Sequence, residues 1–231
     1  KIKQFKGLSW LDSLYKTIIF RDFFIAASRA CLRLRVERVA RIQERKIQQI
    51  KQQEKCRVLF FLQTPSVWKY DVLYRKMTEL PYFEPIVVIS PYNVHLMYDM
   101  TECFRVMRLA EEFAQKQGYN YVSAYDYTKN RWLDVRKMYN PDVVFFSKPY
   151  KDTLPAYHIY NFPKALTLYV PYAMLCIKLF HNNYGLPFHS LLWKHLLETE
   201  FHRKDAIAYQ KNTGVNTEIV GALVMEKLMR T

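Results

Sequence analysis

The sequence is poor in glycine, and its glycines build no recognisable nucleotide-binding or nucleophile motif. Five glycines occur among 231 residues. No G-x-G-x-x-G, Walker A or G-x-S-x-G pattern is present, so phosphate-cradling loops and serine nucleophiles have no motif support. With only ten prolines as well, collagen-like and low-complexity classes are excluded. Because half of the residues are hydrophobic, a packed globular chain is expected.

Cysteine is also scarce, and its spacing fits neither a zinc site nor a disulfide framework. The four cysteines form no C-x-x-C pair. Two of them, Cys56 and Cys176, lie in or beside apolar runs. We therefore expect buried thiols and a protein of the reducing cytosol.

A metal-binding motif is missing as well. The three histidines His189, His195 and His202 are spaced by six and seven residues, and no H-E-x-x-H pattern occurs. Metal ligation by His195 and His202 from one helix face is the weaker alternative. We expect no metal site, and we expect His189 to pack against or cap a helix.

No stretch of the sequence is apolar for long enough to span a membrane. The most apolar early segment, LSWLDSLYKTIIFRDFFIAA at 8–27, is interrupted by four charged residues. A spanning helix needs about 20 mostly apolar residues. No secretory signal is visible either, so we expect a cytoplasmic protein that contacts a membrane only peripherally.

Negative charge is scarce near the N-terminus. Residues 1–57 hold 15 Lys and Arg against five Asp and Glu, whereas the whole chain has a net charge of +14. No proline occurs before residue 65, so residues 1–55 are predicted to form a basic helical extension. This extension has three interpretations: a solvated helix that packs a thin apolar stripe on the domain, a helix on anionic lipid, or a nucleic-acid-binding arm.

After residue 55 short apolar runs alternate with helical patterns. Runs such as VVFF and RVLFFL are continuously apolar, as in parallel strands that helices cover on both faces. The alternation predicts a doubly wound, mostly parallel Rossmann-like sheet over residues 56–221. Strands are expected near 57–62, 86–90, 120–124, 142–147, 165–170 and 217–220, and helices near 69–79, 98–117, 131–139, 155–161, 188–198 and 202–213.

Four predicted strands end in a proline followed by an aromatic residue. Ligands of open parallel sheets bind beyond the carboxyl ends of the strands, and proline directs the chain out of the sheet there. The aromatic rings would line one crevice suited to sugars and polyols, with two lysines placed to meet phosphate. The alternative is that each proline only stops a strand and each lysine is solvated. The candidate binding residues are Trp68, Lys69, Tyr92, Asn93, Lys148, Tyr150 and Tyr172.

Several short blocks between residues 56 and 221 resemble the N-terminal half of the CDP-glycerol glycerophosphotransferase family, which contains teichoic-acid and capsular-polysaccharide polymerases. The blocks are SVWKYDVLY, FEPIVVISPY, WLDVRKMYNPDVVFFSKPY, YHIYNF, LTLYVPY, LPFHSLLWKHLLETEFHRKDA and KNTGVNTEIVG.

The resemblance implies a GT-B architecture of two Rossmann-like domains. This chain would supply the domain that binds a lipid-linked glycan or polyol-phosphate acceptor, and the candidate residues above would contact it. Residues 222–231 would begin the crossover to a C-terminal domain that holds a CDP-activated or other nucleotide-activated donor. No cofactor is expected on the present domain. Because such acceptors are usually lipid-linked, we expect the basic extension to contact an anionic membrane on its cytoplasmic face through Trp10, Arg29, Arg33 and Arg38, and we expect no nucleic-acid partner.

The sequence departs from the family at its expected catalytic position. Family members carry a His-Gly-Thr-type motif after the strand that corresponds to 165–170, whereas this chain reads YVPYAM. His181 is the nearest substitute and is the candidate catalytic base. Two alternatives remain open, namely a non-catalytic binding module with the same fold and a basic nucleic-acid-binding protein. The isolated chain is expected to show no turnover.

Overall fold

The computed structural model of the chain describes residues 9–92, 100–173 and 179–222, with side chains from residue 26 onward. Its centre is a seven-stranded sheet in which every neighbouring pair is parallel, in the order β3-β2-β1-β6-β7-β8-β9. The strands are β1 (Cys56–Leu62), β2 (Phe83–Ile89), β3 (Tyr121–Ser123), β6 (Val143–Phe146), β7 (Leu166–Tyr169), β8 (Lys194–Leu197) and β9 (Thr217–Ile219).

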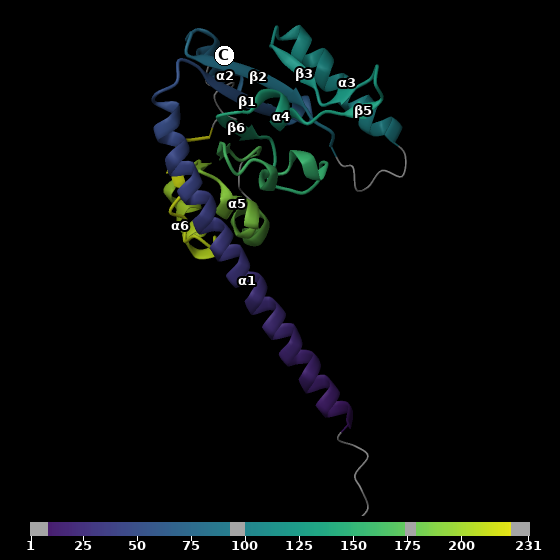
Figure 1. Ribbon diagram of the computed structural model, residues 1–231, viewed down its shortest axis with the longest axis vertical. Coiled ribbons are helices and arrows are strands. Elements are labelled where there is room, and N and C mark those ends of the chain that lie inside the picture. Colours follow the sequence, from purple (N-terminus) through teal and green to yellow (C-terminus); the bar gives the residue numbers. More distant parts are fainter. Residues whose placement is uncertain (1–8, 93–99, 174–178, 223–231) are drawn as a thin grey trace, which may run out of the picture.

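Helices cover both faces of this sheet (Figure 1). The helices are α1 (Ser9–Ile50), α2 (Asp71–Thr78), α3 (Met100–Lys116), α4 (Val135–Tyr139), α5 (Pro187–Leu191) and α6 (Glu200–Tyr209). A small hairpin of β4 (Tyr125–Asp126) and β5 (Arg131–Trp132) precedes α4. The expected α/β class with a parallel, Rossmann-like sheet is therefore confirmed.

The buried strands explain why their sequence is continuously apolar. Along β1, Phe60 joins one core cluster with residues of α2 and α3, and its neighbour Phe61 joins a second cluster on the opposite face. Successive side chains of a strand point to opposite faces. A strand with a core on each side therefore needs an apolar residue at almost every position.

The direction of chain progression reverses beside β1. The chain first adds β2 and β3 on one side of β1, and it then returns to add β6 on the other side. Neighbouring strands whose connections leave in opposite directions open a crevice at their carboxyl ends. The sheet thus has its switch point between β1 and β6.

Three expected elements differ in the structure. In place of the helix expected at 155–161 there are two 3₁₀ turns, Pro155–Tyr157 and Ile159–Asn161. The helix expected at 188–198 ends at Leu191, and β8 follows it between β7 and β9. The short HLL run is buried at alternate positions, so pairing with two neighbours overrides its helical pattern. The helix expected at 131–139 begins only at Val135, because Asp134 caps it by accepting from the Lys137 N–H, while Arg131 and Trp132 pair with β4.

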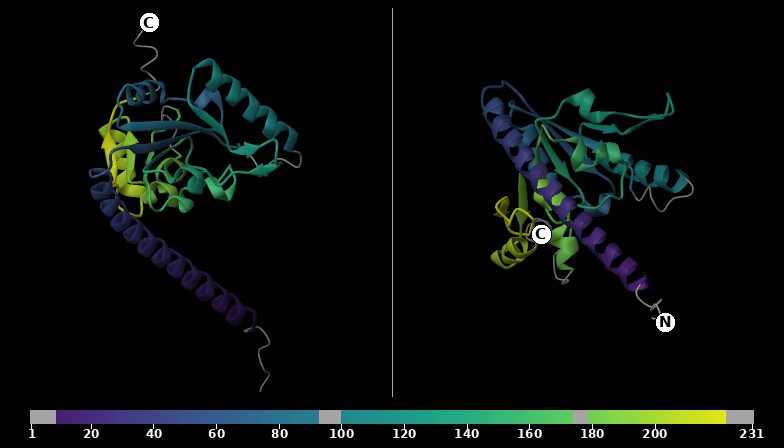
Figure 2. Two further views of the ribbon diagram at one scale, coloured as in Figure 1. Left: turned by 45° about the horizontal axis from the view of Figure 1, so that its top comes forward. Right: turned by 60° about the horizontal axis from the view of Figure 1, so that its bottom comes forward.

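Helix α1 belongs to the domain over its C-terminal part and projects beyond it over its N-terminal part (Figures 1 and 2). Val36 and Val39 pack on the core cluster that faces α5. The stripe continues through two polar residues, Gln43 and Lys46, and both are buried. The predicted division at residue 55 therefore separates segments that share one core.

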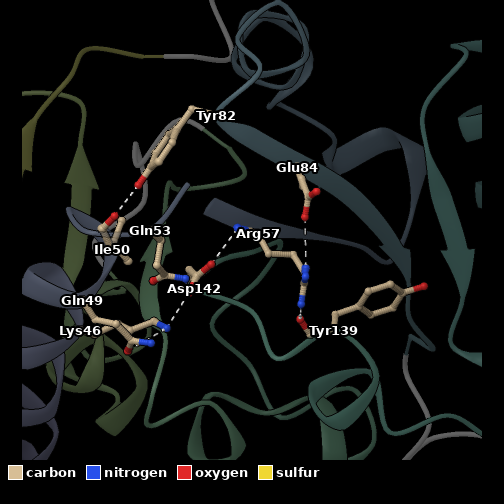
Figure 3. A network of polar contacts seen from close by, with 9 residues as sticks. All are labelled: Lys46, Gln49, Ile50, Gln53, Arg57, Tyr82, Glu84, Tyr139 and Asp142. Atoms are coloured by element: carbon tan, nitrogen blue, oxygen red, sulfur yellow. Dashed lines mark hydrogen bonds and ion pairs between the residues drawn. The ribbon is translucent and has the colours of Figure 1, made fainter. Parts of the chain in front are cut away.

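Polar contacts hold these last turns of α1 in place, and those of Lys46 and Ile50 are drawn in Figure 3. The Gln43 amide donates to the Leu191 carbonyl oxygen at 3.2 Å. The Lys46 ammonium lies 2.5 Å from a carboxylate oxygen of Asp142, just before β6. The hydroxyl of Tyr82 donates to the Ile50 carbonyl oxygen at 2.7 Å. The helix is thereby fixed to the amino-terminal edge of the sheet, opposite the crevice.

Candidate functional site

The candidate site lies where β1 and β6 end, at the switch point of the sheet. Gln63 directly follows β1, and Ser147 and Lys148 directly follow β6. The Tyr70 hydroxyl donates to the Phe146 carbonyl oxygen at 2.9 Å. This bond secures the last residue of β6 from the segment that leads into α2. The crevice is thus built on fixed backbone.

Three of the four predicted aromatic residues gather around Lys148. Its ammonium nitrogen lies 3.5 Å from the ring centroid of Tyr92 and 5.8 Å from that of Tyr172. The rings of Tyr150 and Tyr172 meet edge to face at 6.3 Å. Only 8% of the Lys148 side chain is exposed, and its ammonium lies 4.0 Å from the carboxylate of Asp152. We call Tyr92, Lys148, Tyr150 and Tyr172 the tyrosine–lysine cluster.

The electrostatics of the cluster follow from burial. Burial, and then the contact with the Tyr172 hydroxyl, raises the pKa of Tyr150 above its ordinary value of 10.0. Tyr150 is therefore a neutral hydrogen-bonding group at physiological pH. The cluster presents one cation surrounded by phenol rings, which suits a ligand with C–H faces, hydroxyls and an anionic group.

Lys69 lies behind this cluster and is buried more deeply. Its ammonium donates to the Ser147 carbonyl oxygen at 2.9 Å and lies 5.2 Å from the Tyr169 ring centroid. Burial, and then the charge of Lys148, lowers the pKa of Lys69 well below its ordinary value. Its contacts position the β6 terminus, and it is not among the residues that line the adjoining cavity.

Trp68 does not join the cluster, in contrast to the prediction. Its ring is buried and packs edge-on against Phe60 and Tyr70. Its indole N–H donates to the Tyr119 hydroxyl at 3.0 Å. The reason is the 3₁₀ turn Pro65–Val67, which places two residues between proline and tryptophan and turns the ring back into the core. Asn93, the remaining predicted residue, lies outside the described residues.

A cavity of about 280 Å³ adjoins the cluster. Its wall includes Lys148 and Tyr150, aromatic side chains from β1 and β6, and residues from the turns after β6 and before α5. It also contains Gln63 and Thr153, which the sequence reasoning did not identify. The sequence signal that could have identified them is their position in the chain, because Gln63 follows β1 and Thr153 lies in the turn after β6.

His181 lies apart from this cavity wall. It is exposed and begins a one-turn π-helix, His181–Gly185, before α5. It is not among the residues that line the cavity. Its role as catalytic base stays a prediction.

The histidines considered as metal ligands are His189, His195 and His202. His189 and His195 are fully buried, with ring centroids 4.9 Å apart. His195 is on β8 and His202 is on α6, so they share no helix face. Over the described residues, no group of three or more His, Cys, Asp or Glu side chains is placed to hold a metal ion.

The predicted membrane-contact residues lie on the projecting helix. Arg29, Arg33 and Arg38 are exposed, and the side chain of Trp10 lies outside the described residues. Arg33 pairs with Glu37 at 3.4 Å along the helix. Over the described residues, no helix has both the length and the apolarity needed to cross a bilayer.

Comparison of the chain with protein-family models, with curated proteins and with solved structures finds no match. The resemblance to the CDP-glycerol glycerophosphotransferases therefore rests on the short sequence blocks quoted above.

Proposed function

We propose that this chain is the acceptor-binding domain of a GT-B-type glycerophosphotransferase or glycosyltransferase that makes a teichoic-acid-like or capsular polymer at the cytoplasmic membrane face. The observation that carries the proposal is the tyrosine–lysine cluster at the carboxyl edge of the parallel sheet. Sheets of this kind bind their ligands at that edge. The family resemblance supplies the reaction class, and the cluster supplies a place for its acceptor.

The cluster matches the chemistry of a polyol-phosphate or glycan acceptor. Tyrosine rings pack on C–H faces, and their hydroxyls hydrogen-bond to sugar or glycerol hydroxyls. Lys148 has a largely buried ammonium, and its distance from the Asp152 carboxylate is 4.0 Å. A phosphate at Lys148 would form a charge-assisted hydrogen bond, about twice as strong as a neutral one.

In this proposal the chain's own residues bind and orient the acceptor. The CDP-activated or other nucleotide-activated donor would be bound by a second, C-terminal domain, which would also stabilise the leaving nucleotide. The chain alone is expected to show no transfer from CDP-glycerol to a prenyl-phosphate-linked acceptor, as measured by chromatography of the products. Detectable turnover by the isolated chain would contradict this division of labour.

The projecting part of α1 is proposed to hold the domain on the membrane. Its exposed arginines offer about 1 kcal/mol each toward an anionic surface. Sedimentation with vesicles of anionic and of neutral phospholipid tests this, with duplex and single-stranded DNA as competitors at moderate salt. Binding to DNA but not to anionic vesicles would favour the nucleic-acid alternative.

The acceptor proposal predicts a specific effect of Lys148→Ala. Binding of an oligomeric glycerol phosphate should weaken about ten-fold or more, which corresponds to the roughly 1.5–3 kcal/mol of a hydrogen bond to a charged group. Isothermal titration calorimetry at fixed salt measures this change. Lys129→Ala is the matched control, because Lys129 is an exposed lysine in the β4–β5 turn. Equal losses in the two variants would show that only net charge matters.

A non-catalytic binding module is the second candidate. It is favoured by the segment after β7, where Pro171 and Tyr172 stand in place of the family's histidine motif. Assay of donor hydrolysis by the full-length natural protein that contains this chain separates the two candidates. Acceptor binding without any hydrolysis or transfer would support the module.

A further inference from the structure

The cavity beside the tyrosine–lysine cluster has room for a compact molecule and a largely apolar wall. Its volume of about 280 Å³ lies just below the usual range of roughly 300–1,000 Å³ for small-molecule sites. Phe61, Phe146, Ile159 and Phe188 supply much of the wall, with Leu186 at its side. A molecule of one or two rings fits this space, whereas a polymer chain does not.

Two residues of this wall each carry a buried polar atom that has no hydrogen-bond partner. The atoms are Oε1 of Gln63 and Oγ1 of Thr153, whose residues are only 4% and 6% exposed. A buried polar group without a partner costs about 1–3 kcal/mol. Such groups are rare in native proteins and call for an explanation. A ligand that hydrogen-bonds to them removes this cost.

The contacts of Gln63 show whether the hydrogen-bond partner that it lacks is a donor or an acceptor. Its Nε2 group donates to a carboxylate oxygen of Asp152 at 3.2 Å. Because a carboxylate only accepts, this bond fixes the orientation of the amide. The atom left without a partner is therefore the carbonyl oxygen, which accepts. The missing partner of Gln63 must carry an N–H or O–H group.

The wall carries two lysines, and the carboxylate of Asp152 lies next to it, 4.0 Å from the Lys148 ammonium. Lys148 and Lys151 both line the cavity, and among the described lining residues there is no carboxylate. The ammonium of Lys151 lies 5.5 Å from the ring centroid of Tyr160, which is also part of the wall. An anionic substituent on a bound molecule is therefore favoured beside these lysines.

We propose that this cavity binds a compact, mainly apolar anion that carries one N–H or O–H donor. The donor bonds to Oε1 of Gln63, the apolar body packs against Phe146 and Phe188, and the anion faces Lys148 and Lys151. A molecule with many hydroxyls is excluded from the interior, because most of them would be buried without partners. The proposal does not depend on the transferase function. A polymer acceptor would lie outside on the tyrosines, and the two ligands would share Lys148.

The test uses two acids that have the same shape and differ in one donor. Indole-3-acetate has a ring N–H, and benzofuran-3-acetate has an oxygen in its place. The wild-type chain is expected to bind the indole about ten-fold more tightly by calorimetry, because the benzofuran leaves Gln63 unpaired. Gln63→Met should reduce this preference to less than about two-fold, which is about 0.4 kcal/mol of discrimination. Asp152→Asn is the control and should retain the preference, because asparagine still offers an acceptor to the Gln63 amide.

A second measurement needs no variant. Intermolecular NOEs in the wild-type chain should connect the indole ring to aromatic protons of Phe146 and Phe188. Equal affinity for the two acids, no binding at about 1 mM, or NOEs only to other residues would each overturn the proposal. A loss of binding to oligomeric glycerol phosphate with indole binding intact would reject the acceptor function and leave this site standing.

Discussion

Asp142→Ala should lower the free energy of unfolding by about 3–5 kcal/mol, the usual cost of removing one partner of a buried ion pair. The carboxylate accepts from the Lys46 ammonium at 2.5 Å, from the Gln53 amide at 3.4 Å and from the Arg57 backbone N–H at 2.8 Å. The side chains of Lys46 and Asp142 are only 9% and 6% exposed. The variant therefore leaves a cation and a backbone donor buried without their anion (Figure 3). Urea unfolding followed by circular dichroism measures the loss.

Two further variants isolate the ion pair. Asp142→Asn keeps an acceptor for the Arg57 N–H, and combined with Lys46→Met it completes a double-mutant cycle. The combined loss should be smaller than the sum of the single losses by at least about 1 kcal/mol, because the residues are in contact. Glu84→Ala is the surface control, since Glu84 pairs with the more exposed Lys55 and Arg57 and should cost less than about 1 kcal/mol. Additive single losses, or an Asp142→Ala loss no larger than the control's, would contradict the prediction.

This ion pair also shows where sequence patterns stop being informative. Val36 and Val39 belong to the thin apolar stripe of the predicted helix, and polar residues, Gln43 and Lys46, take the next positions of that spacing. The structure continues the same buried stripe through both, because each finds a polar partner far away in sequence. A periodicity of apolar residues carries no information about such long-range partners.

The carboxyl edge of the sheet gives a similar lesson about spacing. Tyr92, Tyr150 and Tyr172 each directly follow a proline. The structure places Tyr92 and Tyr172 beside the Lys148 ammonium and Tyr150 against the Tyr172 ring. Trp68 follows its proline at a distance of three, and the intervening 3₁₀ turn sends the ring inward. The convergence of the tyrosines was therefore predictable from the ends of parallel strands.

Other parts of the fold and of the site were not predictable in this way. Strand β8 is short and is buried at alternate positions, so only its neighbours β7 and β9 mark it as a strand. The cavity residues Gln63 and Thr153 belong to no motif. They become candidates only when the structure shows that two of their buried atoms lack partners.

The second large effect is expected from acid, through the buried histidine pair. His189 and His195 are fully buried, and their rings stack at 4.9 Å. Burial lowers the pKa of His189 to about 3, an effect that the Tyr184 backbone opposes in part. Burial, and then the neighbouring His189, lowers the pKa of His195 well below its ordinary value. Both rings are therefore neutral in the folded chain at physiological pH.

The sign of the pH dependence follows from the unfolded chain, in which each histidine titrates near pH 6.5. Above that pH the two imidazoles are unprotonated in both the folded and the unfolded state, so the free energy of unfolding is not reduced by their protonation. As pH falls from about 6.5 toward 3, the unfolded state binds protons that the folded state excludes, so the free energy of unfolding decreases by up to about 1.4 kcal/mol per pH unit for each histidine. Between pH 7.5 and 5 the pair should cost about 4 kcal/mol in total. Urea unfolding at several pH values measures this slope, and most carboxylates do not yet titrate in that range.

His189→Leu should remove about half of the slope, because leucine has a similar volume and no titrating group. His181→Gln is the control. This variant removes an exposed histidine outside the stacked pair. The charge of His181 is only the last of three causes that set the pKa of His189. The slope should therefore remain nearly unchanged. If the wild-type chain lost no stability between pH 7.5 and 5, the two rings would have to accept protons in the folded state. The packing of β8 against α5 would then have to open to admit water, which hydrogen exchange at the His195 backbone N–H, bonded to the Asn216 carbonyl oxygen at 2.9 Å, would detect.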